Sequence, residues 1–219
     1  MAWEEVKKRK PIVAIMLPHR GSLNCEFLQE MWIPLAYKPV DFCDKLRFLC
    51  RVPSLPLARN ILVSEMLKSK ATHGLFIDSD LVMENPSDPN EALRRMLSLD
   101  LPIVTGLYRA KQTHGFNYAI WMKNPKGEKG FVHVTSWTGN LFPIDVCGAG
   151  FLLVKREVFE SVEPPWFHWE MPGEVSEDFS FLLKAKEKGY ETVCYSEVRL
   201  SHLGNIWVTT DGKFRVSRV

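Results

Sequence analysis

Two aspartates, Asp78 and Asp80, follow an apolar run in "THGLFIDSDLVME" (72–84), with only Ser79 between them. The apolar residues before them are typical of a strand that is covered on both faces of a sheet. Side chains i and i+2 of an extended chain point the same way, so we expect both carboxylates to face one place. Two like charges held together are costly unless a cation or a shared proton relieves them. The pair indicates a site for a hard divalent cation, although a turn cap beside a solvated aspartate is the simpler alternative.

Arg59 lies in the first turn of a helix predicted from about Pro56 to Ser69. A cation at this end of a helix opposes the macrodipole and is mildly unfavourable. The arrangement makes sense if the helix end faces a bound phosphate, which the arginine and the free N–H groups would bind together. The alternative is an arginine that extends to solvent. Beside an acidic pair that could hold a metal diphosphate, the phosphate role is favoured.

Glu177, Asp178 and His202 are the remaining candidates. The two acids lie in the first turn of a helix predicted from Ser176 to Gly189, where carboxylates also stabilise a helix without any further role. We expect at least one of them to face the carboxyl edge of the sheet, where ligands of open α/β sheets bind. His202 is expected in the tail after the last predicted strand. A lone histidine is commonly a core or surface residue, so His202 becomes a metal ligand only if the chain returns it to the acidic pair.

The elements that must position these residues alternate between strand and helix, which predicts one α/β domain with a mostly parallel, Rossmann-like sheet and flanking helices. Asp88, Pro89 and Glu91 predict a capping box at the start of one helix, and Phe179, Leu182 and Leu183 predict the buried stripe of another. Turn residues among aromatic residues indicate hairpins between 107 and 145. The predicted strands cover residues 11–17, 75–77, 101–106 and 192–195, and "GAGFLLVKREVFE" (148–160) predicts a further strand followed by a short helix. The other predicted helices begin near residues 24, 56, 89 and 177.

The composition is that of a globular chain of 219 residues, with 46% hydrophobic and 25% charged residues. A net charge of +2 is too small to indicate a nucleic-acid partner. Five cysteines without a CxxC pair favour reduced thiols and a cytoplasmic location. The apolar stretch 12–17 is too short for a signal peptide or an integral membrane span. We therefore expect a soluble protein.

Five ordered segments, "PLARN", "LFIDSDLVME", "GAGFLLVKREVFE", "SEDFSF" and "SHLG", resemble the motifs of GT-A fold glycosyltransferases, especially family-2-like enzymes. A D-x-D alone is weak support, but five motifs in the right order are much stronger. The resemblance runs from about Pro11 to His202 and implies a single domain over 1–219. Its nucleotide-binding half would cover about 11–106 and its acceptor half about 107–204.

The resemblance also implies roles for the candidate residues. In that family the D-x-D residues hold Mn²⁺ or Mg²⁺ on the diphosphate of a nucleotide-sugar donor. Asp78 would meet the ribose or the metal, Asp80 would ligate the metal, and His202 would close the metal site. Asp178, or less favourably Glu177, would be the catalytic base. The first loop, Pro18 to Gly21, would hold the base and ribose of the nucleotide. The implied substrate- and nucleotide-binding residues are Pro18, His19, Arg20, Arg59, Asp78, Ser79, Gly148, Ala149 and Gly150.

The chain is short for that family, so the acceptor (a glycan, lipid or protein) is unassigned, and residues 107–145 with the loop 164–173 are the expected acceptor region. The mechanism is inverting if Asp178 takes the acceptor proton, and a retaining mechanism stays open if it only binds the acceptor. Two alternatives remain. "DSDLV" also fits the motif of haloacid-dehalogenase-type phosphohydrolases, in which Asp78 would be phosphorylated. An inactive GT-A module that only binds a nucleotide sugar is the other.

Overall fold

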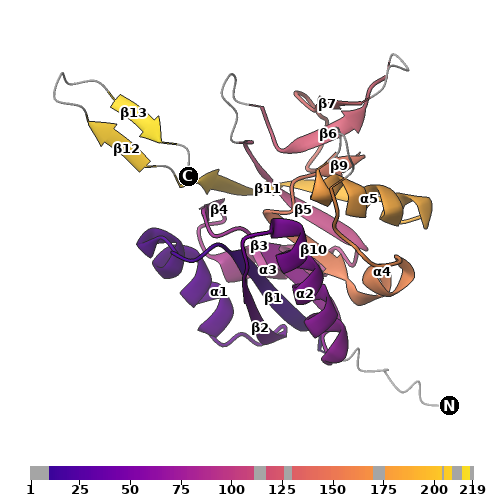
Figure 1. The fold of residues 1–219 in the computed structure, drawn as a ribbon, viewed down its shortest axis with the longest axis horizontal. Coiled ribbons are helices and arrows are strands. Elements are labelled where there is room, and N and C mark those ends of the chain that lie inside the picture. The colour runs from indigo at the N-terminus through magenta and orange to yellow at the C-terminus, as the bar shows by residue number, and fades with distance from the viewer. Residues whose placement is uncertain are drawn as a thin grey trace.

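A computed structural model shows an eight-stranded sheet with helices on both faces (Figure 1). The order of the main path is β2-β1-β3-β10-β5-β11-β4, and β8 pairs with β11 beside it. The structure describes residues 10–110, 117–125, 130–169, 176–203, 205–208 and 214–217. The sheet strands are β1 (Ile12–His19), β2 (Asp44–Arg51), β3 (His73–Ile77), β4 (Leu81–Asn85), β5 (Ile103–Tyr108), β8 (Leu141–Ile144), β10 (Phe151–Lys155) and β11 (Thr192–His202).

Five of the eight strands run in one direction, which confirms the predicted α/β class. β1 is parallel to β2 and β3, and β11 is parallel to β5. β10 lies antiparallel between β3 and β5, so these two groups share one direction. β4 and β8 are antiparallel to β11. The carboxyl ends of β1, β3, β5 and β11 therefore meet at one edge of the sheet.

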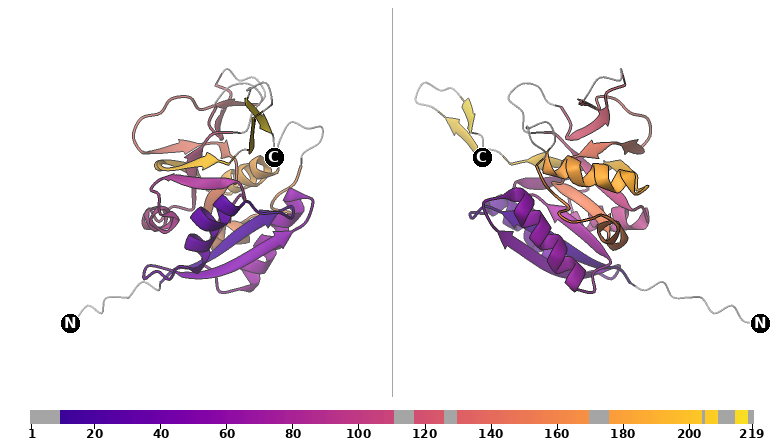
Figure 2. Two further views of the ribbon diagram at one scale, coloured as in Figure 1. Left: turned by 90° about the vertical axis from the view of Figure 1, so that its left-hand side faces the viewer. Right: turned by 45° about the vertical axis from the view of Figure 1, so that its right-hand side comes forward.

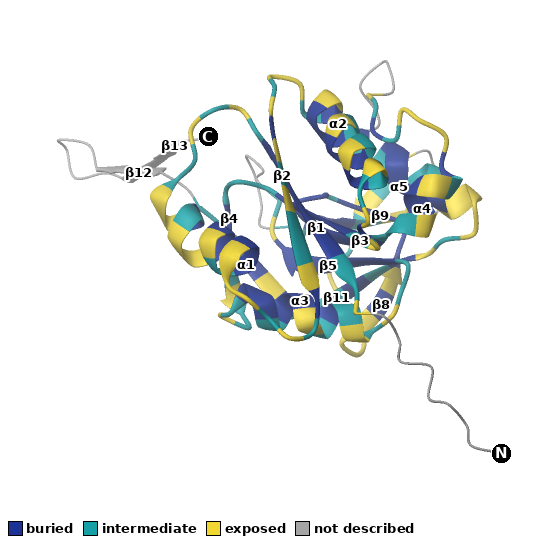
Figure 3. Cartoon of the chain, turned by 90° about the horizontal axis from the view of Figure 1, so that it is seen from below, coloured by how far each residue is buried: buried dark blue, intermediate teal, exposed yellow. Residues whose placement is uncertain are grey.

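Two hydrophobic cores lie on the two faces of the sheet (Figure 3). One face is covered by α2 (Leu55–Lys68), α4 (Arg156–Ser161) and α5 (Glu177–Glu187). The other is covered by the π-helix η1 (Phe27–Trp32), α1 (Ile33–Tyr37) and α3 (Pro89–Ser98). These helices confirm those predicted near residues 24, 56, 89 and 177, and α4 confirms the short helix predicted after the strand within 148–160. β1, β3, β5 and β10 are buried on both sides, as their continuous apolar sequences predict.

The hairpin-rich region between 107 and 145 is also confirmed in its described part. β6 (Ile120–Lys123) pairs antiparallel with β7 (Phe131–His133) and with β9 (Val146–Cys147), forming a small sheet beside the main one (Figure 2). Residues 111–116 and 126–129 of this region lie outside the described residues. A two-stranded hairpin, β12 (Asn205–Val208) with β13 (Phe214–Ser217), follows the main sheet.

Several strand predictions need correction. β2 and β4 were not predicted, because an edge strand and a five-residue strand that leave some side chains exposed lack a continuous apolar run. β1 extends through His19, so Pro18 and His19 belong to the strand and not to a loop. β11 extends to His202, because its second half pairs with β4. His202 is therefore the end of a strand and not part of a tail.

Two helix details were also wrong. Asp88 caps α3 by accepting from the Asn90 backbone N–H at 2.9 Å, but Glu91 bonds Arg94 and Arg95 in place of closing a capping box. The buried stripe of α5 contains Phe181 and Leu182, whereas the predicted Phe179 and Leu183 are only partly buried.

Candidate functional site

Four candidate residues lie where parallel strands end at the carboxyl edge of the sheet. His19 ends β1, Asp78 follows β3, Tyr108 ends β5 and His202 ends β11. The remaining candidates come from loops and helix starts that reach the same edge. Parallel strands deliver their carboxyl ends to one place, which is how residues far apart in the sequence come together here.

The geometry of the Asp78–Asp80 pair differs from the prediction. Ser79 and Asp80 form a turn between β3 and β4, and the Leu81 backbone N–H donates to the Asp78 carbonyl at 3.3 Å. The chain is therefore not extended here, and the rule for side chains i and i+2 does not apply. All three residues of the motif are half-buried. Their proximity comes from the turn.

Arg59 is buried in the first turn of α2, with only 2% of its side chain exposed. Its Nη1 donates to Glu177 Oε1, and its Nη2 donates to Asp78 Oδ1 at 3.2 Å. The guanidinium therefore joins the end of β3 to the start of α5. Its Nε atom is buried and has no hydrogen-bond partner among the described residues. Arg59 faces away from bulk solvent, and two of its three nitrogens are already bound to carboxylates.

The charged groups of this cluster, Arg59, Asp78 and Glu177, shift one another's pKa values. Burial raises the pKa of Asp78 and of Glu177, and in both cases the Arg59 guanidinium opposes the rise. Burial alone would lower the pKa of Arg59, but the neighbouring carboxylates, Asp78 first among them, raise it above its ordinary value. The arginine is a permanent cation that compensates two buried carboxylates.

Tyr108 organises the glycine segment from Gly148 to Gly150. The Gly150 backbone N–H donates to the Tyr108 hydroxyl oxygen at 2.9 Å, and the Asp78 N–H donates to the Gly150 carbonyl at 2.8 Å. A Cβ atom on Gly148 would lie 2.5 Å from that hydroxyl oxygen, and one on Gly150 would lie 2.8 Å from it. Both positions require glycine because the tyrosine passes so close. Burial raises the pKa of Tyr108 well above its ordinary value, and the charge of Asp78 adds to this.

Asp178 lies at the start of α5 with both carboxylate oxygens held in place. Oδ1 accepts from the Ser176 hydroxyl and from the Phe179 N–H at 2.9 Å, and Oδ2 accepts from the Ala149 N–H at 3.3 Å. The Ser176 hydroxyl thus binds Asp178 and does not cap the helix backbone. The side chain is half-buried, whereas that of Glu177 is only 4% exposed. Of the two acids, Asp178 is the more exposed.

The predicted metal ligands, Asp78, Asp80 and His202, belong to two backbone segments that lie side by side. His202 pairs with Leu81 across β11 and β4, and the Leu203 N–H donates to the Asp80 carbonyl at 2.7 Å. Asp78 is close enough to both Asp80 and His202 for their charges to act on its pKa. Carboxylate oxygens and an imidazole suit Mn²⁺ or Mg²⁺ as a donor set. Within the described ranges, however, no three His, Cys, Asp or Glu side chains are drawn together tightly enough to hold a metal ion.

The predicted nucleotide-binding loop begins inside β1. Pro18 is buried, His19 is half-buried and Arg20 is exposed. The His19 Nδ1 atom is buried and has no hydrogen-bond partner in the described part of the chain. An unsatisfied buried nitrogen is costly, so a polar contact to this atom would stabilise the site.

Tyr108 is the site residue that the sequence analysis did not identify. It lies between the glycine segment and His202, whose ring meets the tyrosine ring edge-on at 5.5 Å between centroids. Its position at the carboxyl end of a predicted buried strand was the available signal. The same rule that selected the aspartate pair would have selected it.

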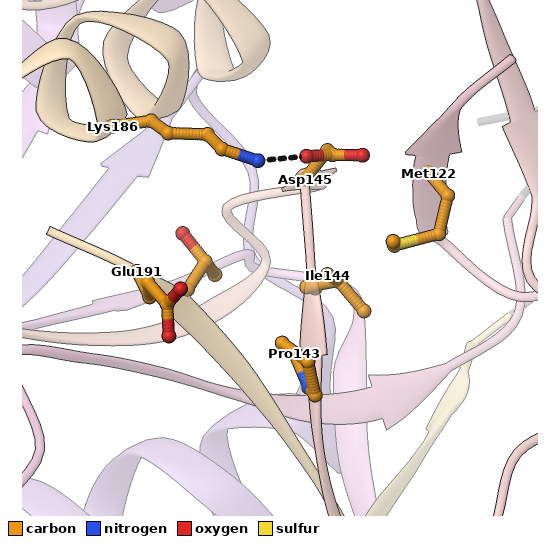
Figure 4. A pocket seen from close by; sticks show the side chains of 7 residues that line it. Met122, Pro143, Ile144, Asp145, Lys186 and Glu191 are labelled. Carbon is orange, nitrogen blue, oxygen red and sulfur yellow. Dashed lines mark hydrogen bonds and ion pairs between the residues drawn. The ribbon is translucent and has the colours of Figure 1, made fainter. Parts of the chain in front are cut away.

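A small pocket of about 40 Å³ lies between β8, β11 and α5 (Figure 4). Lys186 donates to Asp145 beside it, which ties α5 to the hairpin region. None of the predicted site residues lines this pocket, and its volume suits only a few water molecules. It is therefore separate from the candidate site.

The sheet and its helices define a GT-A-like fold, which confirms the fold class implied by the resemblance. The chain is similar in structure to A197 from STIV, with a TM-score of 0.61, 20% identity and coverage of 95% of both chains. It is also similar to GalNAc-T7, solved with UDP, GalNAc and Mn²⁺, with a TM-score of 0.58 and 13% identity over 90% of this chain and 44% of that one. At these identities the likeness shows the fold.

The sequence comparisons add no family to this result. No protein-family model matches the chain, and no curated protein matches its sequence. Across the described residues, no helix is long and apolar enough to cross a membrane.

Proposed function

We propose that this protein is a metal-dependent glycosyltransferase that moves a sugar from a nucleotide-diphosphate sugar to an acceptor hydroxyl. The observation that carries the proposal is the link from Asp78 to Asp178 at the carboxyl edge of a GT-A-like sheet. The Asp78 N–H bonds the Gly150 carbonyl, and the Ala149 N–H bonds the Asp178 carboxylate. A residue for the donor side and a residue for the acceptor side are thus fixed to one glycine segment.

On the donor side, Asp80 and His202 would hold Mn²⁺ or Mg²⁺, with Asp78 at the ribose or the metal. When bound, such a cation stabilises negative charge on the leaving diphosphate. Ser79 and the segment from Pro18 to Arg20 would contact the nucleotide, and the unsatisfied Nδ1 of His19 supports a polar contact there. For Arg59 we propose a positioning role in place of direct phosphate contact, because Asp78 and Glu177 occupy two of its nitrogens.

On the acceptor side, the Asp178 carboxylate would take the proton from the acceptor hydroxyl. The acceptor oxygen forms a bond to the anomeric carbon, and the bond from that carbon to the diphosphate oxygen breaks, its electron pair leaving with the nucleoside diphosphate. A single displacement of this kind inverts the configuration. The hydrogen bonds to both Asp178 oxygens orient the carboxylate, and its half-buried side chain supports contact with substrate. Glu177 is less suited to this role because it is buried against Arg59.

The experiment that tests this proposal compares Asp178→Asn with wild-type protein in donor binding and in sugar transfer. A general base acts in the transition state, so the substitution should lower turnover by about 10²- to 10⁴-fold and leave donor affinity nearly intact. Asp88→Asn is the matched control, because the Asp88 side chain bonds Lys38 and Asn90, which are not site residues, and asparagine caps equally well. Full turnover of Asp178→Asn at saturating acceptor would contradict the proposed base.

The same assay separates the two alternatives. Release of phosphate from small phosphomonoesters, without sugar transfer, would show a phosphohydrolase. Donor binding without turnover by wild-type protein would show an inactive module. A cytoplasmic location is part of the proposal and is supported by the five cysteines, all of which are free thiols.

A further inference from the structure

An open groove of about 470 Å³ lies along the outer edge of β11, and it contains none of the residues assigned above. Its volume falls in the range of small-molecule sites, roughly 300–1,000 Å³. The lining residues come from β4, α3, β5, the hairpin region and β11. They are Asn85, Arg95, Leu107, Tyr118, Trp137, Asn140, Ser196, Glu197 and Arg199.

The groove exists because β11 is incompletely paired on this edge. β8 pairs with residues 192–195 of β11, and β4 pairs with residues 199–202. Between them β11 bulges, since Tyr195 and Arg199 lie opposite the consecutive residues Gly106 and Leu107 of β5. Bulges of this kind re-aim side chains and are common beside binding sites. The three bulged residues, 196–198, leave a gap in the sheet edge between the two short strands.

Polar side chains hold the shape of the groove before any ligand arrives. Glu197 accepts from Asn140 Nδ2 at 2.6 Å and from the Tyr195 hydroxyl at 2.8 Å. Asn85 Nδ2 donates to the Glu197 carbonyl at 2.8 Å. Arg199 is exposed and makes no ion pair with the described residues. The carboxylate is therefore oriented, and the guanidinium has all its donors available.

Aromatic residues form the wall on the side of the hairpin region. Tyr118 meets Trp137 edge-on at 5.2 Å between ring centroids, and Trp137 stacks on Phe142 at 5.1 Å. Both lining rings are half-buried. The Arg109 guanidinium lies over the Tyr118 ring, 4.6 Å from its centroid, and covers one face of that ring. A ring fixed by its neighbours offers a rigid surface at small entropic cost.

This combination suits a carbohydrate. Amide, carboxylate and guanidinium groups each present paired polar atoms, which match neighbouring hydroxyl groups of a sugar, and aromatic rings pack on its C–H face. A polyanion suits the groove less well. Of its two arginines, Arg95 is already bonded to Glu91 at 2.8 Å and lies 4.0 Å from Glu197.

The groove is also next to the candidate site. Arg199 and His202 are three residues apart on one strand, which is about 10 Å of extended chain. Leu107, in the groove, and Tyr108, in the site, are consecutive residues of β5 and face opposite sides of the sheet, so the two regions meet at the end of this strand. A chain of sugars that occupies the groove can therefore reach the carboxyl edge of the sheet.

We infer that the groove along β11 is a carbohydrate-binding site that holds a glycan acceptor. Its role as an acceptor site rests on the proposed glycosyltransferase function, but its carbohydrate binding does not. The inference narrows the acceptor to a glycan and places it on Glu197 and Arg199.

The test uses an array of defined neutral and uronic-acid oligosaccharides, probed with wild-type protein in the absence of nucleotide and metal. The oligosaccharide that binds most strongly is then titrated by calorimetry into wild type, Arg199→Ala and Glu197→Gln. Loss of a hydrogen bond to a charged group should weaken binding about tenfold in each variant. Arg94→Ala is the matched control, because Arg94 lies on the same helix as Arg95, pairs with Glu91 and does not line the groove. We expect this control to bind like wild type.

The inference is overturned if wild type binds no oligosaccharide on the array, or if both groove variants bind as tightly as wild type. Donor hydrolysis and nucleotide affinity, measured in the same proteins, separate this from failure of the enzyme proposal. Glycan binding that Arg199→Ala weakens, without any donor turnover by wild type, supports the groove and contradicts the transferase. Donor turnover without glycan binding supports the transferase and contradicts the groove.

Discussion

The buried floor of the candidate site and the groove along β11 each contain an arginine, and they hold it in opposite ways. In the floor, which consists of Arg59, Asp78, Tyr108, Gly150 and Glu177, the arginine is bound by carboxylates of the same chain. In the groove, Arg199 is exposed and makes no ion pair with the described residues. A buried charge must be compensated within the protein, whereas an exposed charge is solvated and can pair with a ligand. The floor is therefore suited to fixing geometry and the groove to recognition.

Replacing the arginine of each region with alanine tests this comparison. Arg59→Ala leaves Glu177 and Asp78 uncompensated and should cost about 3–5 kcal/mol of unfolding free energy. Arg199→Ala should stay within about 0.5 kcal/mol of wild type, because exposed changes remote from packed features have little effect. Urea unfolding measures both. Equal free energies of unfolding for the two variants would show that the Arg59 network does not hold the floor together.

A second test of the floor concerns the contact between Tyr108 and the glycine segment. Gly148→Ala places a methyl group 2.5 Å from the tyrosine hydroxyl oxygen, and such overpacking should cost about 1–3 kcal/mol. The cost should fall in a Tyr108→Phe background, which removes that oxygen. Gly150→Ala should be rescued less, since its methyl group would also lie 2.8 Å from Leu81 Cδ1. A double-mutant cycle measures the coupling, and additive costs would mean that the hydroxyl does not set the spacing.

The smallest expected effect concerns His73, which begins β3 at the end opposite to Asp78. Burial, with help from Lys155, lowers the pKa of His73 to about 4. The His73 side chain then binds a proton near pH 6.5 in the unfolded chain but only near pH 4 in the folded protein. His73 therefore reduces stability as the pH falls from about 6.5 to about 4. The raised pKa values of Asp78 and Glu177 act in the opposite direction over this range.

His73→Gln should therefore flatten the loss of stability between pH 6.5 and 4. Chemical unfolding at several pH values measures this slope in the variant and in wild type. If the two slopes are the same, His73 does not titrate abnormally, and the acid sensitivity belongs to other groups.

The parts of the fold that could be predicted are those with a local signal. Buried strands such as β1 and β5 have continuous apolar sequences, and α3 has a capping aspartate followed by proline. β2 and β4 lack such a signal because their exposed positions interrupt the apolar pattern. The length of β11 depends on β4 and β8, which lie far away in the sequence, so no local pattern determines where that strand ends.

The candidate site could be predicted residue by residue but not as an arrangement. The sequence indicated Arg59, Asp78 and Asp178, but their links through Glu177 and Gly150 exist only when β3, β10 and two helices meet. The phosphate role predicted for Arg59 remains untested, and its two ion pairs are what led us to propose positioning. The groove could not be predicted, because it is a gap between two strands on one edge of β11.

The most direct test of the central claim is calorimetric titration of a panel of nucleoside diphosphates into wild type and Asp80→Asn, with Mn²⁺ and with EDTA. We predict that wild type binds one of them with Mn²⁺ and loses it in EDTA. Asp80→Asn should weaken binding at least by the roughly tenfold that even an outer-shell change at a metal site causes. Its unfolding free energy should stay near that of wild type. Equal affinity with Mn²⁺ and EDTA, or equal affinity in Asp80→Asn, would contradict a metal-dependent donor site at the end of β3.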